Sequence, residues 1–361
     1  MTAAVKNLDE ALRAAQQGRG KPAVPAAQRQ LVIDVREWLA DSAPPVWLVE
    51  GIIQRGMLYA VTAITNHGKT AITLLMAVAV GAGLDWAGHK TTKAGVLILC
   101  GENPDGFRTR MRATLQAVGV EEEELWGHVK VLPYSVPLRD YVTQIREEAK
   151  AFGVEYGMVL IDTSPSFFSG DSEDDNMQAL HHALDMRVFH ELPGKPAVIA
   201  NCHPTKGADQ EHLVPRGGGA FLNEIDTNLT VWAEEEVATF HWATKKRGPD
   251  FEPIAFEFHG KTMVEGEHKV PTVVALPISE ERAHALKKER RERENRVLYA
   301  MLHHPGASYS TIAGACGWDP GRAKSRINRI MKILMVDALV AKKRGSYVLT
   351  KAGEAEARMI T

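Results

Sequence analysis

The chain has 361 residues, of which 45% are hydrophobic and 24% charged, and its formal net charge is −2. This composition is ordinary for a folded globular protein and excludes a polycationic chain, so any contact with nucleic acid must come from local basic patches. The length is enough for one large domain and a second, small one.

The cysteines and the hydropathy of the chain indicate in which cellular compartment the protein resides. Cys100, Cys202 and Cys316 lie far apart without CxxC spacing, and two of them end apolar runs. This pattern favours reduced, buried thiols over disulfides or a zinc site. The sequence has no run of about 18 apolar residues and does not open with a signal-peptide pattern. We therefore expect a cytoplasmic protein.

The first region, residues 1–45, contains two short stretches with apolar residues at helical spacing. A linker rich in Gly, Pro and Ala, GRGKPAVPAA, separates them. We expect an N-terminal helical arm that is either loosely held or docked on a neighbouring subunit. The apolar positions are Val5, Leu8, Leu12, Leu31, Val35, Trp38 and Leu39.

The segment YAVTAITNHGKT, residues 59–70, has the features of a phosphate-binding P-loop. An apolar strand leads into a turn that ends in Gly-Lys-Thr, and a long helical pattern follows, which is the context the motif requires. Lys69 would reach the β- and γ-phosphates of ATP, and the Thr70 hydroxyl would ligate Mg²⁺. Ala63 replaces the first glycine of the usual pattern, which brings affinity into question. The expected nucleotide-binding residues are Asn66, His67, Gly68, Lys69, Thr70 and Ala71.

Downstream of the P-loop, near-continuous apolar runs alternate with helical patterns. Such runs are typical of parallel strands buried on both faces, and the alternation predicts an α/β fold with a doubly wound, mostly parallel sheet. The expected strands span residues 95–100, 129–132, 158–162 and 197–201. The expected helices span residues 107–118, 137–152 and 174–192.

Polar residues follow the carboxyl ends of these strands, where doubly wound sheets bind ligands. Asp162 is expected to hold Mg²⁺ together with Thr70, unless it only caps the next loop. Glu102 is the candidate general base that polarises the attacking water, or else a surface acid in a turn. His203 would sense the γ-phosphate, or it would have a structural role.

Beyond residue 204 the pattern changes. Residues 204–220 form a polar, glycine-rich loop that contains Lys206 and Arg216 and is too long for an ordinary connection. Strands without helices follow, which predicts an antiparallel extension of the sheet. The basic stretch 244–248 is either a solvated hairpin turn or a cationic finger that reaches the γ-phosphate bound by a neighbouring subunit. The expected strands span residues 228–232, 238–244 and 254–258.

Residues 46–260 resemble the RecA-like ATPase core, and most closely the RepA family of hexameric replicative helicases carried by plasmids and related mobile elements. The resemblance rests on the order of the motifs PVWLVEGIIQRGMLYAVTAITNHGKT, CGEN, VLIDTSPSF, NCHPTKG, RGGGAFLNEIDTNL and ATKKRG. It implies a RecA-like fold, ATP with Mg²⁺, a homo-oligomeric, hexameric ring and single-stranded DNA as a partner.

The resemblance also implies roles for individual positions. Glu102 matches the catalytic glutamate and Asp162 the Walker B aspartate, while the 205–219 loop matches a DNA-binding loop that lines a hexamer's central channel. Lys246 and Arg247 lie where such hexamers place basic residues that act on a neighbour's nucleotide. The implied catalytic residues are Lys69, Glu102, Asp162, His203, Lys246 and Arg247, and Lys206 and Arg216 are expected to contact DNA.

A dense run of mixed charge, HALKKERRERE, indicates a solvated helix or linker over residues 279–294. It separates the ATPase domain, 46–278, from a C-terminal module, 295–361. The module's helical patterns and two short strands around a basic turn resemble the winged-helix class. Its basic side chains suit contact with the phosphates of duplex DNA, although winged helices also dock on proteins. The residues expected to contact DNA are Arg322, Arg326, Arg329, Lys343 and Arg344.

The sequence therefore predicts an ATP-hydrolysing motor on single-stranded DNA. One alternative is a regulatory or loader ATPase that acts as a switch on duplex DNA without unwinding it. Another is an interaction protein that binds ATP but turns it over slowly.

Overall fold

The computed structural model describes residues 32–40, 44–321, 323–343 and 346–360. The chain divides into two units, Met1–Pro45 and Val46–Thr361. The described residues of the first unit form the short helix α2 (Val35–Ala40), none of whose residues is buried. The apolar positions predicted at Val5, Leu8, Leu12 and Leu31 lie outside the described residues.

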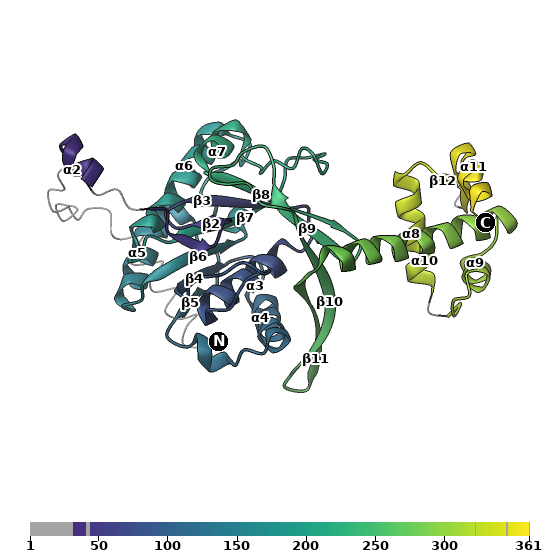
Figure 1. Ribbon diagram of the computed structural model, residues 1–361, viewed down its shortest axis with the longest axis horizontal. Coiled ribbons are helices and arrows are strands. Elements are labelled where there is room, and N and C mark those ends of the chain that lie inside the picture. The colour runs from purple at the N-terminus through teal and green to yellow at the C-terminus, as the bar shows by residue number, and fades with distance from the viewer. Residues whose placement is uncertain (1–31, 41–43, 322, 344–345, 361) are drawn as a thin grey trace. The chain divides into compact units, whose positions relative to one another are not determined.

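The second unit is built on a nine-stranded sheet (Figure 1). Its strands are β3 (Leu58–Thr62), β4 (Gly95–Cys100), β5 (Val129–Leu132), β6 (Tyr156–Asp162), β7 (Ala197–Cys202), β8 (Thr227–Glu234), β9 (Val237–Trp242), β10 (Ile254–Glu265) and β11 (His268–Ile278). Across the sheet the order is β11-β10-β9-β8-β3-β7-β6-β4-β5. Neighbours from β8 to β5 are parallel, and those from β8 to β11 are antiparallel. The fold is thus α/β with a large, mostly parallel sheet, as predicted.

Helices cover both faces of this sheet, and a short antiparallel pair precedes it. The first face carries α3 (Lys69–Ala82) and α4 (Pro104–Val118), the second carries α5 (Leu138–Ala151), α6 (Asn176–Arg187) and α7 (Gly218–Glu224), and the preceding pair is β1 (Trp47–Val49) and β2 (Ile53–Gln54). Tyr59 and Val61 of β3 enter the core under α3, whereas Leu58 and Ala60 enter the core under α5 and α6. Burial on both faces explains why the parallel strands are apolar almost throughout.

One part of the predicted sheet is wrong. The strand at 228–232 was expected in the antiparallel extension, but β8 pairs in parallel with β3, and the antiparallel part starts only at β9. The segment between β7 and β8 is therefore a crossover connection that contains α7. Its glycines concealed this helix, since Gly217 precedes it with a φ of 115°.

A long hairpin of β10 and β11 forms one edge of the sheet and runs beside α4 (Figure 1). β10 continues past the predicted end at residue 258, and β11 was not predicted. Because β11 contains Pro271 and Pro277, the sequence did not predict a strand here. An edge strand, however, tolerates residues without an N–H. Met263 and Val274 of the hairpin pack on Ala113 of α4, which holds the hairpin against this face.

The C-terminal part of the chain has a core of its own, in which Val297 and Ile327 are fully buried. Its elements are α8 (Glu280–His303), α9 (Tyr309–Ala315), α10 (Lys324–Val336), β12 (Val340–Lys343), β13 (Ser346–Leu349) and α11 (Lys351–Met359). The charged run at 284–294 lies inside α8, which is continuous because it contains no Gly or Pro and has pairs such as Arg290 with Glu294, 2.9 Å apart.

None of the helices that the structure describes is both long and apolar enough to cross a membrane. The three cysteines are buried and free, as predicted. Burial raises the pKa of Cys100 and Cys202 to about 12 and that of Cys316 to about 11, because the thiolate would lose its hydration.

We predict that these thiols are unreactive in the folded protein, since the thiolate is the reactive form. Ellman's reagent at about pH 8 should label the native chain far more slowly than the denaturant-unfolded chain, which serves as the control. Equal rates in the two states would contradict the burial of the cysteines.

Candidate nucleotide-binding site

A cleft of about 630 Å³ opens where β4, β6 and β7 end. Because these strands are parallel, their carboxyl ends meet at one edge of the sheet, where such folds bind ligands. Of the residues predicted to bind the nucleotide, His67 does not line the cleft. Those that do are Asn66, Gly68, Lys69, Thr70, Ala71, Glu102, Asp162 and His203.

The P-loop turn depends on Gly68, whose φ of 84° lies in the left-handed region that favours glycine. A Cβ at this position would lie 2.1 Å from Cζ of Phe258 in β10, so a side chain has no room. Helix α3 starts at the next residue, Lys69. The free N–H groups of its first turn and its dipole therefore favour an anion in the cleft.

Ala63 occupies the position of the usual first glycine without backbone strain. It is fully buried, and its φ is not positive. Its N–H donates to the carbonyl oxygen of Cys202 at 3.3 Å, which continues the pairing of β3 with β7. The backbone at this position does not need a conformation that only glycine can adopt, so alanine fits here without strain.

Lys69 and His203 form a contact at the base of the cleft. The Lys69 side chain is buried, and its Nζ lies 3.3 Å from Nδ1 of His203. Burial lowers the pKa of Lys69, although the carboxylates of Asp162 and Glu102 act in the opposite direction. Burial and the Lys69 charge lower the pKa of His203, so a neutral ring accepts from the ammonium. Phosphate oxygens would stabilise this ammonium further.

The environment of Asp162 fits Mg²⁺, which prefers oxygen ligands. Thr70 Oγ1 donates to Asp162 Oδ1 at 2.9 Å, and Asn201 Nδ2 donates to the same oxygen at 2.7 Å. Burial raises the pKa of Asp162, while both hydrogen bonds favour the carboxylate. The Oδ1 atom of Asn201 is buried without a partner beside this pair. The oxygen donors here suit a hard divalent cation.

The described residues contain no group of three or more His, Cys, Asp or Glu side chains that could hold a metal ion. With Thr70 and Asp162 as the protein ligands, phosphate oxygens and water would have to supply the other ligands of Mg²⁺. Mg²⁺ commonly binds in this way, because it keeps several waters and uses few protein ligands.

Glu102 lies at the mouth of the cleft, exposed and directly before α4. Thr163 Oγ1 donates to Glu102 Oε2 at 3.1 Å and orients the carboxylate. The next residue, Asn103, caps α4 by accepting from the N–H of Gly106 at 3.0 Å, which fixes the backbone beside Glu102. A carboxylate held in this way can take a proton from water that attacks a bound phosphate.

The basic stretch 244–248, predicted as a cationic finger, forms contacts within its own chain and does not line the cleft. Arg247 Nη1 lies 2.8 Å from Oδ1 of the buried Asp226, and Lys246 Nζ lies 3.0 Å from Asp250. Lys245 donates to the carbonyl oxygen of Leu222 at 3.0 Å. The side chain of Arg247 is nevertheless 61% exposed.

The predicted DNA-binding loop begins at the nucleotide site. The N–H of Arg216 donates to the carbonyl oxygen of His203 at 2.8 Å, and a bridge between Pro204 and Pro215 closes the base of the loop. Arg216 also pairs with Glu173 at 3.1 Å, whereas Lys206 is exposed. The loop is thus anchored to the residue that contacts Lys69.

Three of the basic residues predicted to contact DNA in the C-terminal part, Arg326, Arg329 and Lys343, lie on α10 and β12. Arg326 packs over Trp318, with its guanidinium carbon 5.2 Å from the ring centroid, and the side chain of Arg329 is 62% exposed. Lys343 is exposed at the end of β12. Arg322 and Arg344 lie outside the described residues.

Arg110 lines the cleft but was not predicted from the sequence. Thr163 and Asn201, which donate to Glu102 and Asp162, were not predicted either. Asn103, which caps α4, and Phe107 and Arg110 within α4 all line the cleft, and this helical spacing is a signal that could have identified Arg110. Its Nε is buried without a hydrogen-bond partner. Arg110 therefore brings a positive charge to the cleft, and one of its donors is buried without a partner.

We predict that Arg110→Ala weakens ATP binding by about 10- to 100-fold, because a hydrogen bond from a charged donor is worth about 1.5–3 kcal/mol. Titration with a fluorescent ATP analogue measures the affinity. Arg112→Ala is the matched control, since Arg112 lies on the same helix but pairs with Glu122 outside the cleft at 3.1 Å. Equal affinities of the two variants would contradict a phosphate contact by Arg110.

Comparison with known proteins agrees with this geometry. A family model described as AAA domain matches residues 8–209, more than half of the chain. No curated protein matches the sequence. The matched region contains the P-loop, Glu102, Asp162 and His203. The chain therefore belongs to the AAA domain family, and its cleft carries the residues of a P-loop ATPase.

Proposed function

We propose that this protein is an ATP-hydrolysing motor on single-stranded DNA, and that it is a hexameric replicative helicase of the RepA type. The observation that supports this most directly is the link between Lys69, His203 and Arg216. His203 contacts the phosphate-binding lysine through its ring, and its carbonyl oxygen accepts from the N–H of Arg216 in the basic loop. A change at the γ-phosphate would therefore reach a loop suited to a nucleic-acid backbone.

In the proposed reaction the P-loop amides and Lys69 hold the phosphates, while Thr70 and Asp162 hold Mg²⁺. Bound Mg²⁺ would neutralise charge on the β- and γ-phosphates. Glu102, oriented by Thr163, places the attacking water and takes its proton. Lys69 and Arg110 stabilise the charge that develops on the transferred phosphoryl group.

Single-stranded DNA is the proposed partner of the 205–219 loop. Lys206 is exposed on this loop, and Arg216 stands at its base with one ion pair to Glu173. These cations would contact phosphates without reading bases, as proteins that follow a single strand do. Displacement of His203 when the γ-phosphate leaves would move the loop and the bound strand.

Assembly into a ring is part of the proposal, because Lys246 and Arg247 do not line the cleft of their own chain. In a ring, one of the residues Lys245, Lys246 and Arg247 would act on the nucleotide of a neighbouring subunit. Arg247 is the better suited of the two predicted residues, because its side chain is 61% exposed and that of Lys246 is 16% exposed. The exposed apolar side chains of α2, Val35, Trp38 and Leu39, support the proposal of an arm that docks on a neighbour.

We also propose that the C-terminal part is a winged-helix domain that binds duplex DNA. The order of α9, α10 and the hairpin of β12 and β13 supports this, because a basic helix precedes a short two-stranded wing. Arg326, Arg329 and Lys343 would contact phosphates.

The motor is tested by ATP hydrolysis with and without single-stranded DNA, with particle mass measured on the same samples. The expected result is a ring-sized particle whose turnover increases with single-stranded DNA. Turnover by a monomer that does not respond to single strands would contradict the motor and favour the DNA-bound switch. Strand displacement then separates a helicase from a loader.

Glu102→Gln should lower ATP turnover by about 10²-fold or more, as expected for loss of a general base, and leave ATP affinity within a few-fold. Turnover and affinity are measured separately. Glu121→Gln is the control, because Glu121 is an exposed acid beyond the end of α4 and does not line the cleft. Normal turnover in Glu102→Gln would remove Glu102 from its proposed role.

The double variant Arg326→Ala/Arg329→Ala should bind duplex DNA more weakly and with a smaller dependence on salt, since each lost phosphate contact lowers the salt slope by about one. Fluorescence anisotropy over a salt series measures both. Arg358→Ala on α11 is the control, because its side chain is 71% exposed but lies outside the basic helix and wing. Equal slopes in the three proteins would exclude α10 as the DNA-contacting helix.

A further inference from the structure

The side chain of His67 does not line the cleft and contacts β8 instead. Its Nδ1 accepts from the backbone N–H of Ala233 at 3.0 Å, and its ring meets Trp232 edge to face with the centroids 5.0 Å apart. An acceptor at Nδ1 requires a neutral ring with its proton on Nε2. Burial and the charge of Lys69 lower the pKa of His67, which keeps the ring in this form. The P-loop is thus fastened to the end of β8.

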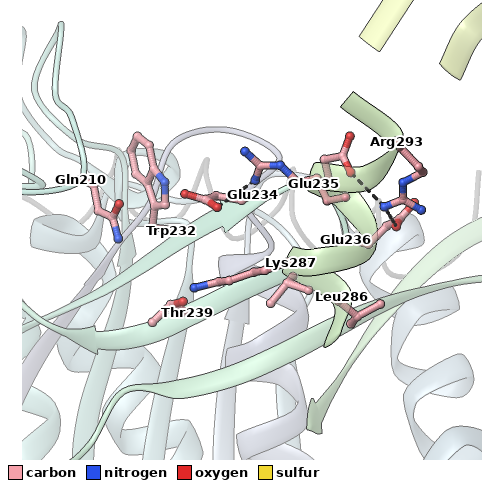
Figure 2. Close-up of a pocket in the computed structure, with 11 residues that line it drawn as sticks. Gln210, Trp232, Glu234, Glu235, Glu236, Thr239, Leu286, Lys287 and Arg293 are labelled. Atoms are coloured by element: carbon pink, nitrogen blue, oxygen red, sulfur yellow. Dashed lines mark hydrogen bonds and ion pairs between the residues drawn. The ribbon is translucent and has the colours of Figure 1, made fainter. Parts of the chain in front are cut away.

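The end of β8 leads directly into an acidic turn. Glu234 is the last residue of β8, and Glu235 has a φ of 57° in the turn that connects it to β9. Figure 2 shows Glu234 next to Trp232, and Glu235 and Glu236 near Arg293 of α8.

Arginines of α8 bind this turn. Arg290 Nη1 lies 2.8 Å from Glu234 Oε2, and Arg293 Nη2 lies 3.4 Å from Glu235 Oε2 (Figure 2 draws the Arg293 contacts). Arg290 also pairs with Glu294, whose side chain is 2% exposed. Arg290 thus links Glu234 of β8 to the buried Glu294 of its own helix, so the pairs form one network. We call Glu234, Glu235, Arg290 and Arg293 the acidic clamp.

We propose that His67 is a positioning residue that couples the P-loop to α8 through Trp232, Ala233 and the acidic clamp. Nucleotide binding would order the P-loop, and His67 would then hold the end of β8 in place. The acidic clamp would in turn restrain α8. The inference rests on the proposed binding of ATP in the cleft. Since coupling between two sites is reciprocal, restraint of α8 must in turn favour ATP binding.

This arrangement gives the chain a route from the nucleotide to its C-terminal part that does not use the 205–219 loop. Helix α8 continues without a break from the clamp to residues that form the C-terminal core, such as Val297 and Leu298. Ordering or release of α8 at the clamp would therefore alter how the C-terminal part is held when ATP binds or leaves.

The test measures hydrogen exchange of the amides of residues 280–294 in the full-length protein, with and without a non-hydrolysable ATP analogue. In the wild type, the analogue should slow this exchange by at least about fivefold, the lower range of allosteric coupling. His67→Ala should lose the effect. His67→Asn should keep it, because the amide oxygen of asparagine can replace Nδ1 as the acceptor.

A second variant keeps the test valid if His67→Ala disturbs the P-loop itself. Arg290→Ala/Arg293→Ala leaves the cleft intact but breaks the acidic clamp, so ATP-dependent slowing in α8 should disappear and ATP affinity should fall by the same factor. Lys288→Ala is the matched control, because it removes an exposed cation from α8 outside the clamp. It should behave as the wild type does.

ATP affinity, measured by titration of a fluorescent analogue, separates the two ways in which the inference can fail. A wild-type protein that binds no nucleotide would overturn the proposed function and the coupling with it. A protein that binds nucleotide with unchanged exchange in α8 would overturn the coupling alone, as would full slowing in the broken-clamp variant.

Discussion

The elements around the cleft are arranged so that they stabilise the buried carboxylate of Asp162. A carboxylate removed from water costs several kcal/mol unless it has hydrogen bonds and opposite charge beside it. Here these come from different elements: Thr70 from α3, Asn201 from β7, and the ammonium of Lys69. The charge becomes tolerable only once the sheet and its first helix are assembled. The site can therefore form only together with this edge of the sheet.

A second buried acid organises the opposite end of the same strands. Asp226 accepts from the N–H of Leu58 at 2.8 Å and pairs with Arg187 and Arg247 at 3.2 and 2.8 Å. It thereby joins the start of β3, helix α6 and the basic stretch after β9. The cations of that stretch consequently serve the fold, and a role toward another subunit would be added to this structural one.

Much of the core could be predicted because its strands are buried on both faces, which gives apolar runs, and because the P-loop, Glu102 and Asp162 follow strand ends. The remainder depends on contacts that sequence patterns do not encode. The parallel pairing of β8 requires the crossover through α7, whose glycines concealed it. β11 contains prolines that only an edge position permits. The orientation of His67 toward β8 follows from Trp232 and Ala233, which are distant in sequence.

The prolines of β11 limit how this protein can associate. Pro271 and Pro277 are an even number of positions apart, so both ring nitrogens face the same side of the strand. Because they cannot donate to β10, that side is the outer edge of the sheet. An edge that lacks donors at these positions is a poor template for a further strand. The two prolines thus hinder the addition of a further strand along the outer edge of the long hairpin.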